Sequence, residues 1–300
     1  MLPFWLLLPG LLVVAGVQIY PALFTVYLGF HSVEPSSGQY IFRGLANFQR
    51  LLRTSLFYES LGHTAVFLIG YVALTLVGAM LVALLLNQRL RLSAVAVTLI
   101  FIPWVLSDVV AGVVWRLFVV PDYGVFSPFF ANPAIFGGSQ GISVLTSPPP
   151  PPLVRGLALP PAPAMLWLIL ASTWKALPFI SLLLLAALQT VPAEVLESAR
   201  IDGANHWHAF RAITLPLILP TVVVALFNLL IGGINGVGMV FSMTSGGPGS
   251  ATTVLSYLLY VIGFSRIDFG LAAALSLCMT VINIALVAVT IRVSSVGEEE

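Results

Sequence analysis

Long, uninterrupted runs of apolar residues dominate the chain, with no strict alternation of apolar and polar positions. A bilayer core of about 30 Å needs roughly 20 apolar residues per helix, whereas the strands of a membrane barrel would alternate. The runs therefore predict an all-α membrane protein, in a single domain over residues 1–300, with about six transmembrane helices. We place them at about residues 3–30, 61–87, 93–119, 164–188, 215–237 and 270–293.

Two further apolar stretches need separate interpretations. Residues 254–264 are too short to span a bilayer, so we predict an extra helix that packs in the bundle or lies at an interface. The first run has no basic residues before it and is longer than the core of a signal peptide. We therefore expect it to be a retained spanning helix.

Composition supports a membrane protein and excludes several other classes. Hydrophobic residues make up 59% of the chain and charged residues 8%, whereas a typical soluble domain has about 25% charged residues. The net charge is only +1 and no basic cluster is present, which argues against nucleic-acid binding. The one cysteine, Cys278, allows neither an internal disulfide nor a cysteine-based metal site, and we predict no metal site.

The segments between the apolar runs are polar and differ in kind. Residues 32–58 predict an aqueous loop that ends in an amphipathic stretch, and residues 121–163 form a proline-rich loop typical of a variable surface insertion. Residues 189–214 carry five charged side chains. Among the loops and chain ends, five Arg residues fall on each side of the predicted bundle. Charge bias therefore leaves the orientation open.

The charged segment 189–214 has the signals of a short helix held between two longer ones. Pro192 and Glu194 suit a first helical turn, where a missing N–H costs little and negative charge favours the helix dipole. Gly203 suits a C-terminal cap in the left-handed region, and a second helix would run from about Trp207 into the next span. Such a helix could transmit movement of a docked partner to the membrane helices.

The spacing within this segment resembles a known family. Glu197, Ser198 and Ala199 are followed at fixed intervals by Gly203 and by the terminal motif at 213–216, which reads ITLP. This pattern is similar to the cytoplasmic E-A-A loop of binding-protein-dependent ABC importer permeases, with serine replacing one alanine. The string from Thr244 to Phe264 further resembles the sugar-permease branch, and specifically the maltose-type first permease.

The resemblance implies a type I ABC importer permease fold in the cytoplasmic (inner) membrane, and it implies several partners. These are a second permease subunit in a heterodimer, two ATPase subunits, an extracytoplasmic solute-binding protein and a sugar-like solute. The coupling helix would contact the ATPase through Glu197, Ser198, Ala199, Arg200, Asp202 and Gly203. Both termini would be cytoplasmic, with residues 32–58, 121–163 and 238–269 outside.

The chain contains no phosphate-binding P-loop motif. We therefore expect this subunit to bind no cofactor and to have no catalytic residues, with ATP and magnesium on the partner ATPase.

Polar residues within apolar runs are candidates for solute contacts, because polar groups at membrane depth are costly. Asn228 and Asn235 are seven residues apart, which predicts one helix face, and Gly236 belongs to a glycine cluster beside them. Amides, hydroxyls and aromatic rings suit a sugar, and the short helix after residue 253 offers Ser256, Tyr257 and Tyr260. The alternative for these residues is ordinary packing and interhelical hydrogen bonding.

Two charges fall near the middle of predicted spans, Asp108 in the third and Lys175 in the fourth. A neutralising ion pair is the simplest interpretation, since either charge alone would be expensive in a bilayer. In the alternative, one of the two faces the translocation path and meets the solute.

Other functions remain open at this point. An importer of another solute, such as glycerol phosphate, an amino acid or a polyamine, belongs to the same class. An ion-coupled secondary transporter would be expected to show an inverted repeat, and none is visible. An intramembrane enzyme would need convergent acid, base or metal-binding residues, which the sequence does not offer.

Overall fold

The computed structural model describes residues 2–34, 38–88, 93–121, 123–130, 132, 143–147 and 161–296. The elements are α1 (Leu2–Val14), η1 (Ala15–Ile19), α2 (Tyr20–Gly29), β1 (His31–Val33), β2 (Tyr40–Phe42), α3 (Ala46–Leu52), α4 (Ser55–Leu86), α5 (Ser93–Val105), α6 (Asp108–Leu117), α7 (Ser127–Phe130), α9 (Pro163–Leu188), α10 (Ala193–Ile201), α11 (His206–Ala209), η2 (Phe210–Thr214), α12 (Leu215–Asn235), α13 (Gly238–Met243), α14 (Leu255–Tyr260), η3 (Val261–Ser265) and α15 (Phe269–Val296). Within the described residues, five helices are long and apolar enough to cross a membrane, or six if α5 and α6 form one broken span.

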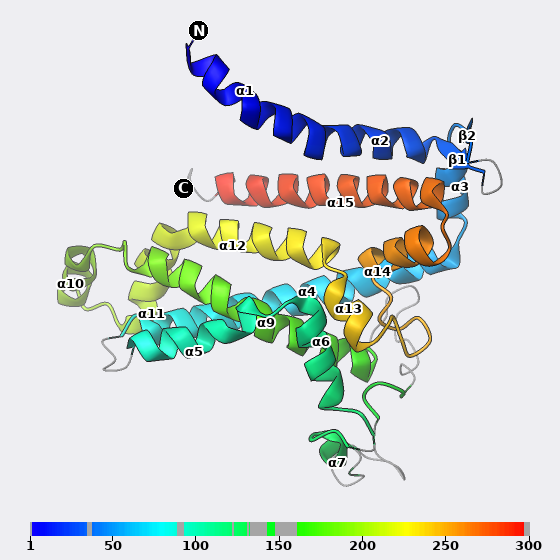
Figure 1. Cartoon of the computed structure of the whole chain (residues 1–300). Helices are drawn as coiled ribbons and strands as arrows, with labels where there is room; N and C mark the ends of the chain where they lie inside the picture. Colours follow the sequence, from blue (N-terminus) through cyan, green and yellow to red (C-terminus); the bar gives the residue numbers. More distant parts are fainter. Residues whose placement is uncertain are drawn as a thin grey trace.

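The long helices lie side by side in a bundle (Figure 1). The continuous helix α1–η1–α2 lies beside α15, and α12 lies on the other side of α15. The start of α1, the end of α15 and α10 all lie toward one end of the bundle, whereas the β1–β2 hairpin lies at the opposite end. The segment with the permease-like spacing is therefore on the same side as the start of α1 and the end of α15.

The packing between α4 and α9 is the most extensive helix contact, and small residues make it possible. Thr75, Ala79 and Ala83 recur every four residues on α4 and are completely buried, as is Ala171 on α9. A Cβ atom added at Gly70 would come within 2.9 Å of the Ile169 side chain, so the two helices leave no space there. Small residues at such intervals allow close approach of helices in membranes.

The third predicted span, residues 93–119, is not one helix, and this prediction was wrong. The chain breaks between α5 and α6, and the two helices are bent by 99°. Ser107 is extended there, and its hydroxyl accepts a hydrogen bond from the Val110 N–H at 3.3 Å, which caps α6. Asp108 is therefore the first residue of α6 rather than a mid-helix residue.

Smaller differences concern the loops. The helix predicted from residue 61 begins at Ser55, because the backbone is extended at Thr54. Glu59 lies on an exposed face of this helix, where its carboxylate accepts a hydrogen bond from the Ser250 hydroxyl. The predicted loop 32–58 contains the antiparallel hairpin β1–β2 and helix α3. Within the predicted loop 121–163, the structure describes the short helix α7, while the proline run at 148–152 lies outside the described residues.

The other predicted helices agree with the structure. α9 and α15 match the runs at 164–188 and 270–293, and the extra helix at 254–264 corresponds to α14 and η3. The residues of the N-terminal helix α1–η1–α2 are mostly exposed to the surroundings of the chain, although that helix is strongly apolar. Its apolar surface therefore contacts lipid or another chain.

Candidate functional site

Helix α10 projects from one end of the bundle and ends in a well-defined turn (Figure 1). Pro192 is its N-cap, with an extended backbone, and Glu194 lies in its first turn. At its end Gly203 has φ +83°, its N–H donates to the Arg200 carbonyl, and the Ala204 N–H donates to the Ala199 carbonyl at 2.9 Å. This is the hydrogen-bond pattern of a Schellman cap, which reverses the chain.

The segment after this turn is attached rigidly to a membrane span. Asn205 caps the next helix, since its Oδ1 accepts a hydrogen bond from the His208 N–H at 2.8 Å. From His206 the helix continues through η2 and α12 to Asn235. The prediction of a second helix that begins near Trp207 and runs into the span is therefore confirmed.

We call the exposed side chains of α10 and its C-terminal turn the coupling surface. Of the predicted coupling residues, Ala199 is buried against the rest of the chain, and the others are exposed, namely Glu197, Ser198, Arg200, Asp202 and Gly203. Within the described part of the chain, neither Glu197 nor Asp202 forms an ion pair. The sequence analysis did not predict Ile201, which is 87% exposed and adds an apolar side chain to this charged surface.

A second feature is a cavity of about 200 Å³ between α4, the α5–α6 break, α9 and α12. We call it the polar cavity. Its lining includes four residues predicted as solute contacts or intramembrane charges: Asp108, Lys175, Asn228 and Gly236. Helices that are distant in sequence thus bring these residues to one place.

Asp108 and Lys175 form an ion pair within the polar cavity. Nζ of Lys175 lies 2.8 Å from Oδ1 of Asp108, and the Asp108 side chain is 48% exposed, against 19% for Lys175. A Cβ atom at Gly238 would come within 2.7 Å of the Asp108 Cβ, so glycine allows α13 to approach closely. The pair is neutral overall and leaves much of the aspartate open to the cavity.

Aromatic side chains form another part of the polar-cavity lining. Trp104 of α5 and Phe179 of α9 stack with ring centroids 5.4 Å apart, and Tyr71 of α4 also lines the cavity. None of these three was predicted as a solute contact. In the sequence these residues stand out only as aromatic residues within apolar runs. That pattern does not predict which rings face the cavity.

The remaining predicted solute contacts do not line the polar cavity. The Asn235 amide donates to the Ile231 carbonyl of its own helix at 2.8 Å, and the buried Ser256 hydroxyl donates to the Gly236 carbonyl at 2.8 Å. Tyr257 and Tyr260 stack on each other with centroids 6.2 Å apart. Burial, with a smaller effect of Tyr260, raises the pKa of Tyr257, so its hydroxyl keeps its proton.

Metal chemistry has little support in the part of the chain that the structure describes. Among those residues, no three His, Cys, Asp or Glu side chains come together as metal ligands. The arrangement offers instead hydrogen-bonding groups, a neutral ion pair and aromatic faces. These groups suit the binding of a neutral polar solute.

Comparison with known proteins gives consistent results over most of the chain. Residues 75–294 match the family described as "Binding-protein-dependent transport system inner membrane component". The trehalose/maltose transport system permease protein MalF of Thermococcus litoralis is 31% identical over 97% of this chain and 93% of its own. The sulfoquinovosyl glycerol permease SmoG of Agrobacterium fabrum is 29% identical, over 96% and 88%. The sn-glycerol-3-phosphate permease UgpA of Yersinia enterocolitica is 29% identical, over 97% and 93%.

Solved structures share the fold. A chain of a bacterial ABC transporter involved in the import of the acidic polysaccharide alginate has a TM-score of 0.77 and 22% identity, covering 98% of this chain and 95% of its own. A second structure of a bacterial alginate ABC transporter, in complex with an alginate pentasaccharide-bound periplasmic protein, has a TM-score of 0.74 and 22% identity, covering 96% and 92%.

Proposed function

Because the chain belongs to the family of inner membrane components of binding-protein-dependent transport systems, we propose that its polar cavity contacts a sugar or related polyhydroxylated solute during import. The chain is a multi-pass permease subunit of an ABC importer. Family membership also argues against the ion-coupled secondary transporter that the sequence alone left open. The main support for this solute class is the lining of the polar cavity, which combines a neutral ion pair with aromatic side chains.

The charges of the polar cavity favour a neutral solute. Among the residues that the structure describes, Lys175 is the one cation that lines the cavity, and Asp108 compensates its charge. A phosphate ester or sugar acid would require a further uncompensated cation at this depth. Relatives named for trehalose/maltose and sulfoquinovosyl glycerol transport support the sugar class, while the relative named for glycerol phosphate keeps that alternative worth testing.

The coupling surface supports docking of a separate ATPase. Helix α10 is exposed on most of its sides, and the continuous helix after the Gly203 turn would pass its displacement directly into α12. ATP and magnesium would bind to that ATPase rather than to this chain. If the ATPase docks on α10, this end of the bundle would be cytoplasmic, and the β1–β2 hairpin at the opposite end would be outside.

Further partners complete the proposed transporter. The exposed apolar surface of α1–η1–α2 suits a contact with a second permease subunit. An extracytoplasmic solute-binding protein would deliver the solute at the hairpin end. The periplasmic protein named in the alginate transporter structure supports a partner of this kind.

Co-purification in mild detergent from native membranes tests the assembly. We expect the chain to bring with it a second permease and an ATPase with a P-loop. Recovery of the chain alone, in a form that still transports solute without ATP, would contradict the proposal.

Filling the polar cavity should block transport. Gly232 lines the cavity and a Cβ atom there meets no neighbour within 4 Å, so the backbone leaves room for a side chain to start there, and we expect Gly232→Leu to reduce the cavity. We expect solute uptake to fall by about tenfold or more, since about 1.4 kcal/mol of lost solute binding corresponds to that factor. Uptake into proteoliposomes measures the effect. Val224→Leu, at an exposed position of the same helix outside the cavity lining, should transport normally. Equal uptake by the two variants would mean that the cavity is not part of the solute path.

A further inference from the structure

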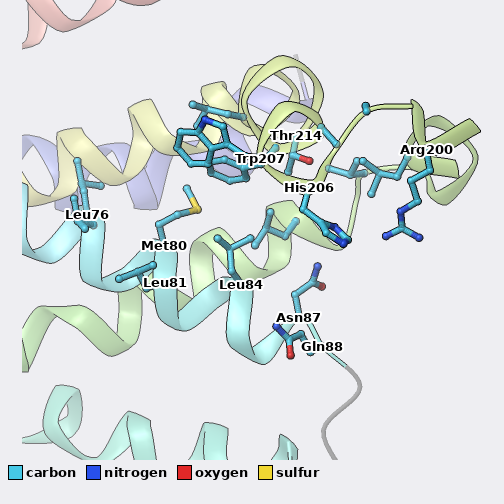
Figure 2. Close-up of a pocket in the computed structure, with 18 residues that line it drawn as sticks. Leu76, Met80, Leu81, Leu84, Asn87, Gln88, Arg200, His206, Trp207 and Thr214 are labelled. Carbon is cyan, nitrogen blue, oxygen red and sulfur yellow. The ribbon is translucent and has the colours of Figure 1, made fainter. Parts of the chain in front are cut away.

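A groove of about 1030 Å³ lies at the α10 end of the bundle, between α4 and the segment that runs from α10 to the beginning of α12 (Figure 2). We call it the interfacial groove. Of its lining residues, Arg200 is also one of the predicted coupling residues, and the others have no role in the proposed function. Its volume is in the range of, or slightly above, that of known small-molecule sites.

The interfacial groove is separate from the polar cavity. On α4, Tyr71 lines the polar cavity and Met80 lines the groove. These residues are nine positions apart, about two and a half turns, so they point to opposite sides of the helix. Among the described residues, the two features share no lining residue, and the groove lies nearer the end of α4, where Val77 and Leu81 are about three-fifths exposed.

The groove changes from apolar to polar along its length. Figure 2 shows Leu76, Met80 and Leu81 toward one end, and Asn87, Gln88, His206 and Arg200 gathered at the other. The polar end coincides with the ends of α4 at Leu86 and of α9 at Leu188. In the described part of the chain, no acidic side chain lines the groove.

Trp207 indicates where the membrane boundary lies. It also lines the groove, is 67% exposed and stacks on Phe210 with centroids 5.9 Å apart. Tryptophan is favoured at the level of lipid headgroups, because its ring is apolar and its N–H is polar. An occupant must therefore be apolar along α4 and polar, with negative charge, beside Arg200.

We propose that the interfacial groove binds one anionic phospholipid, with an acyl chain along α4 and its headgroup at Arg200 and His206. Basic pockets between spanning helices at the membrane surface are suited to anionic headgroups. A bound lipid would connect α4 to the coupling helix α10, so that the charge of the surrounding membrane influences how firmly α10 is held.

Lipid retention in the purified transporter tests the proposal without any need for solute or ATP. The complex is purified from membranes, exchanged into nanodiscs of mixed phosphatidylglycerol and phosphatidylcholine, and released for native mass spectrometry. We expect retained phosphatidylglycerol in excess of phosphatidylcholine. Retention should fall by about fivefold in Arg200→Gln, because one basic residue contributes about 1 kcal/mol to binding an anionic lipid surface.

Matched variants separate the groove from its surroundings. Leu81→Trp would fill the groove, whereas Leu85→Trp changes a residue of α4 with nearly equal exposure, 57% against 58%, that does not line it. Arg211→Gln removes a nearby exposed charge outside the groove. We expect loss of lipid in Leu81→Trp and Arg200→Gln, and normal retention in Leu85→Trp and Arg211→Gln.

Three outcomes would overturn the lipid assignment. The first is equal retention of the two phospholipids or equal behaviour of groove and control variants. The second is displacement of the lipid by soluble glycerol phosphate, which would make the groove a site for a free phosphate ester. The third is loss of the second permease, with unchanged lipid, in the Leu81→Trp variant. Loss of solute uptake alone would concern the proposed function and not this site.

Discussion

A transporter that carries Gly203→Val is expected to insert and assemble but to lose the ATP hydrolysis that a loaded binding protein stimulates. Gly203 has φ +83°, and an L residue in the left-handed region costs about 1–2 kcal/mol, with a higher cost for a β-branched side chain. A Cβ atom at this position meets no neighbour within 4 Å, so the effect would come from the backbone and not from a clash. Without the cap, α10 would lose its fixed angle to the helix that follows.

The matched control is Gly203→Asn, because asparagine tolerates the left-handed region. Stimulated ATPase activity in proteoliposomes should remain near that of the unmodified transporter in this variant. Glu197→Lys tests the surface itself, since Glu197 is exposed and its replacement should leave the fold unchanged while weakening association with the ATPase. Normal stimulation in both Gly203→Val and Glu197→Lys would contradict the role of the coupling surface.

The second large effect is expected from Lys175→Met. This substitution leaves the Asp108 carboxylate without its partner at membrane depth, where an unpaired charge costs about 2.5–3.5 kcal/mol on insertion scales. We expect a lower yield of folded protein and a lower unfolding temperature in detergent. The double variant Asp108→Asn with Lys175→Met removes both charges and should regain most of the stability but not solute uptake.

Exchange of the two charges separates a structural role from solute contact. The variant Asp108→Lys with Lys175→Asp can restore the ion pair but reverses the charges that face the polar cavity, so stability should return without uptake. The exchange Arg50→Asp with Asp268→Arg is the control, because that pair joins α3 to the start of α15 at 2.8 Å, away from the cavity. Full uptake in the Asp108–Lys175 exchange would mean that this pair serves packing alone.

The sequence predicts most of the spans because the length of an apolar run is set by bilayer thickness. The break before Asp108 escapes this reasoning, since hydropathy is averaged over a window in which Ser107 and Asp108 are outweighed by their neighbours. The informative signal was local, because a serine followed by an aspartate is typical of a helix N-terminus. The Gly203 turn could be predicted for the same kind of reason, as its cap depends on residues close in sequence.

The polar cavity could be predicted only in part. Asn228 and Lys175 are conspicuous as polar residues in apolar runs, and both line it. Tyr71 and Trp104 belong to other helices, and their inward orientation depends on packing between segments that are far apart in sequence. Ser256 looked equally suitable, but its hydroxyl donates a hydrogen bond to the Gly236 carbonyl at the end of α12. That carbonyl needs a partner because it lies at a helix end, and only the folded chain brings Ser256 to it.

The close contact of α4 with α9 has a mechanical consequence. The two helices bury small residues such as Ala79, Ala83 and Ala171 and leave no space between Gly70 and Ile169, so we expect them to move together. Alternating access would then require relative motion elsewhere, and α12, which carries Gly232 and Gly236 in the cavity wall, is connected directly to the segment after α10. We therefore expect α4 and α9 to stay fixed relative to each other while α12 moves, with the proposed solute site between them.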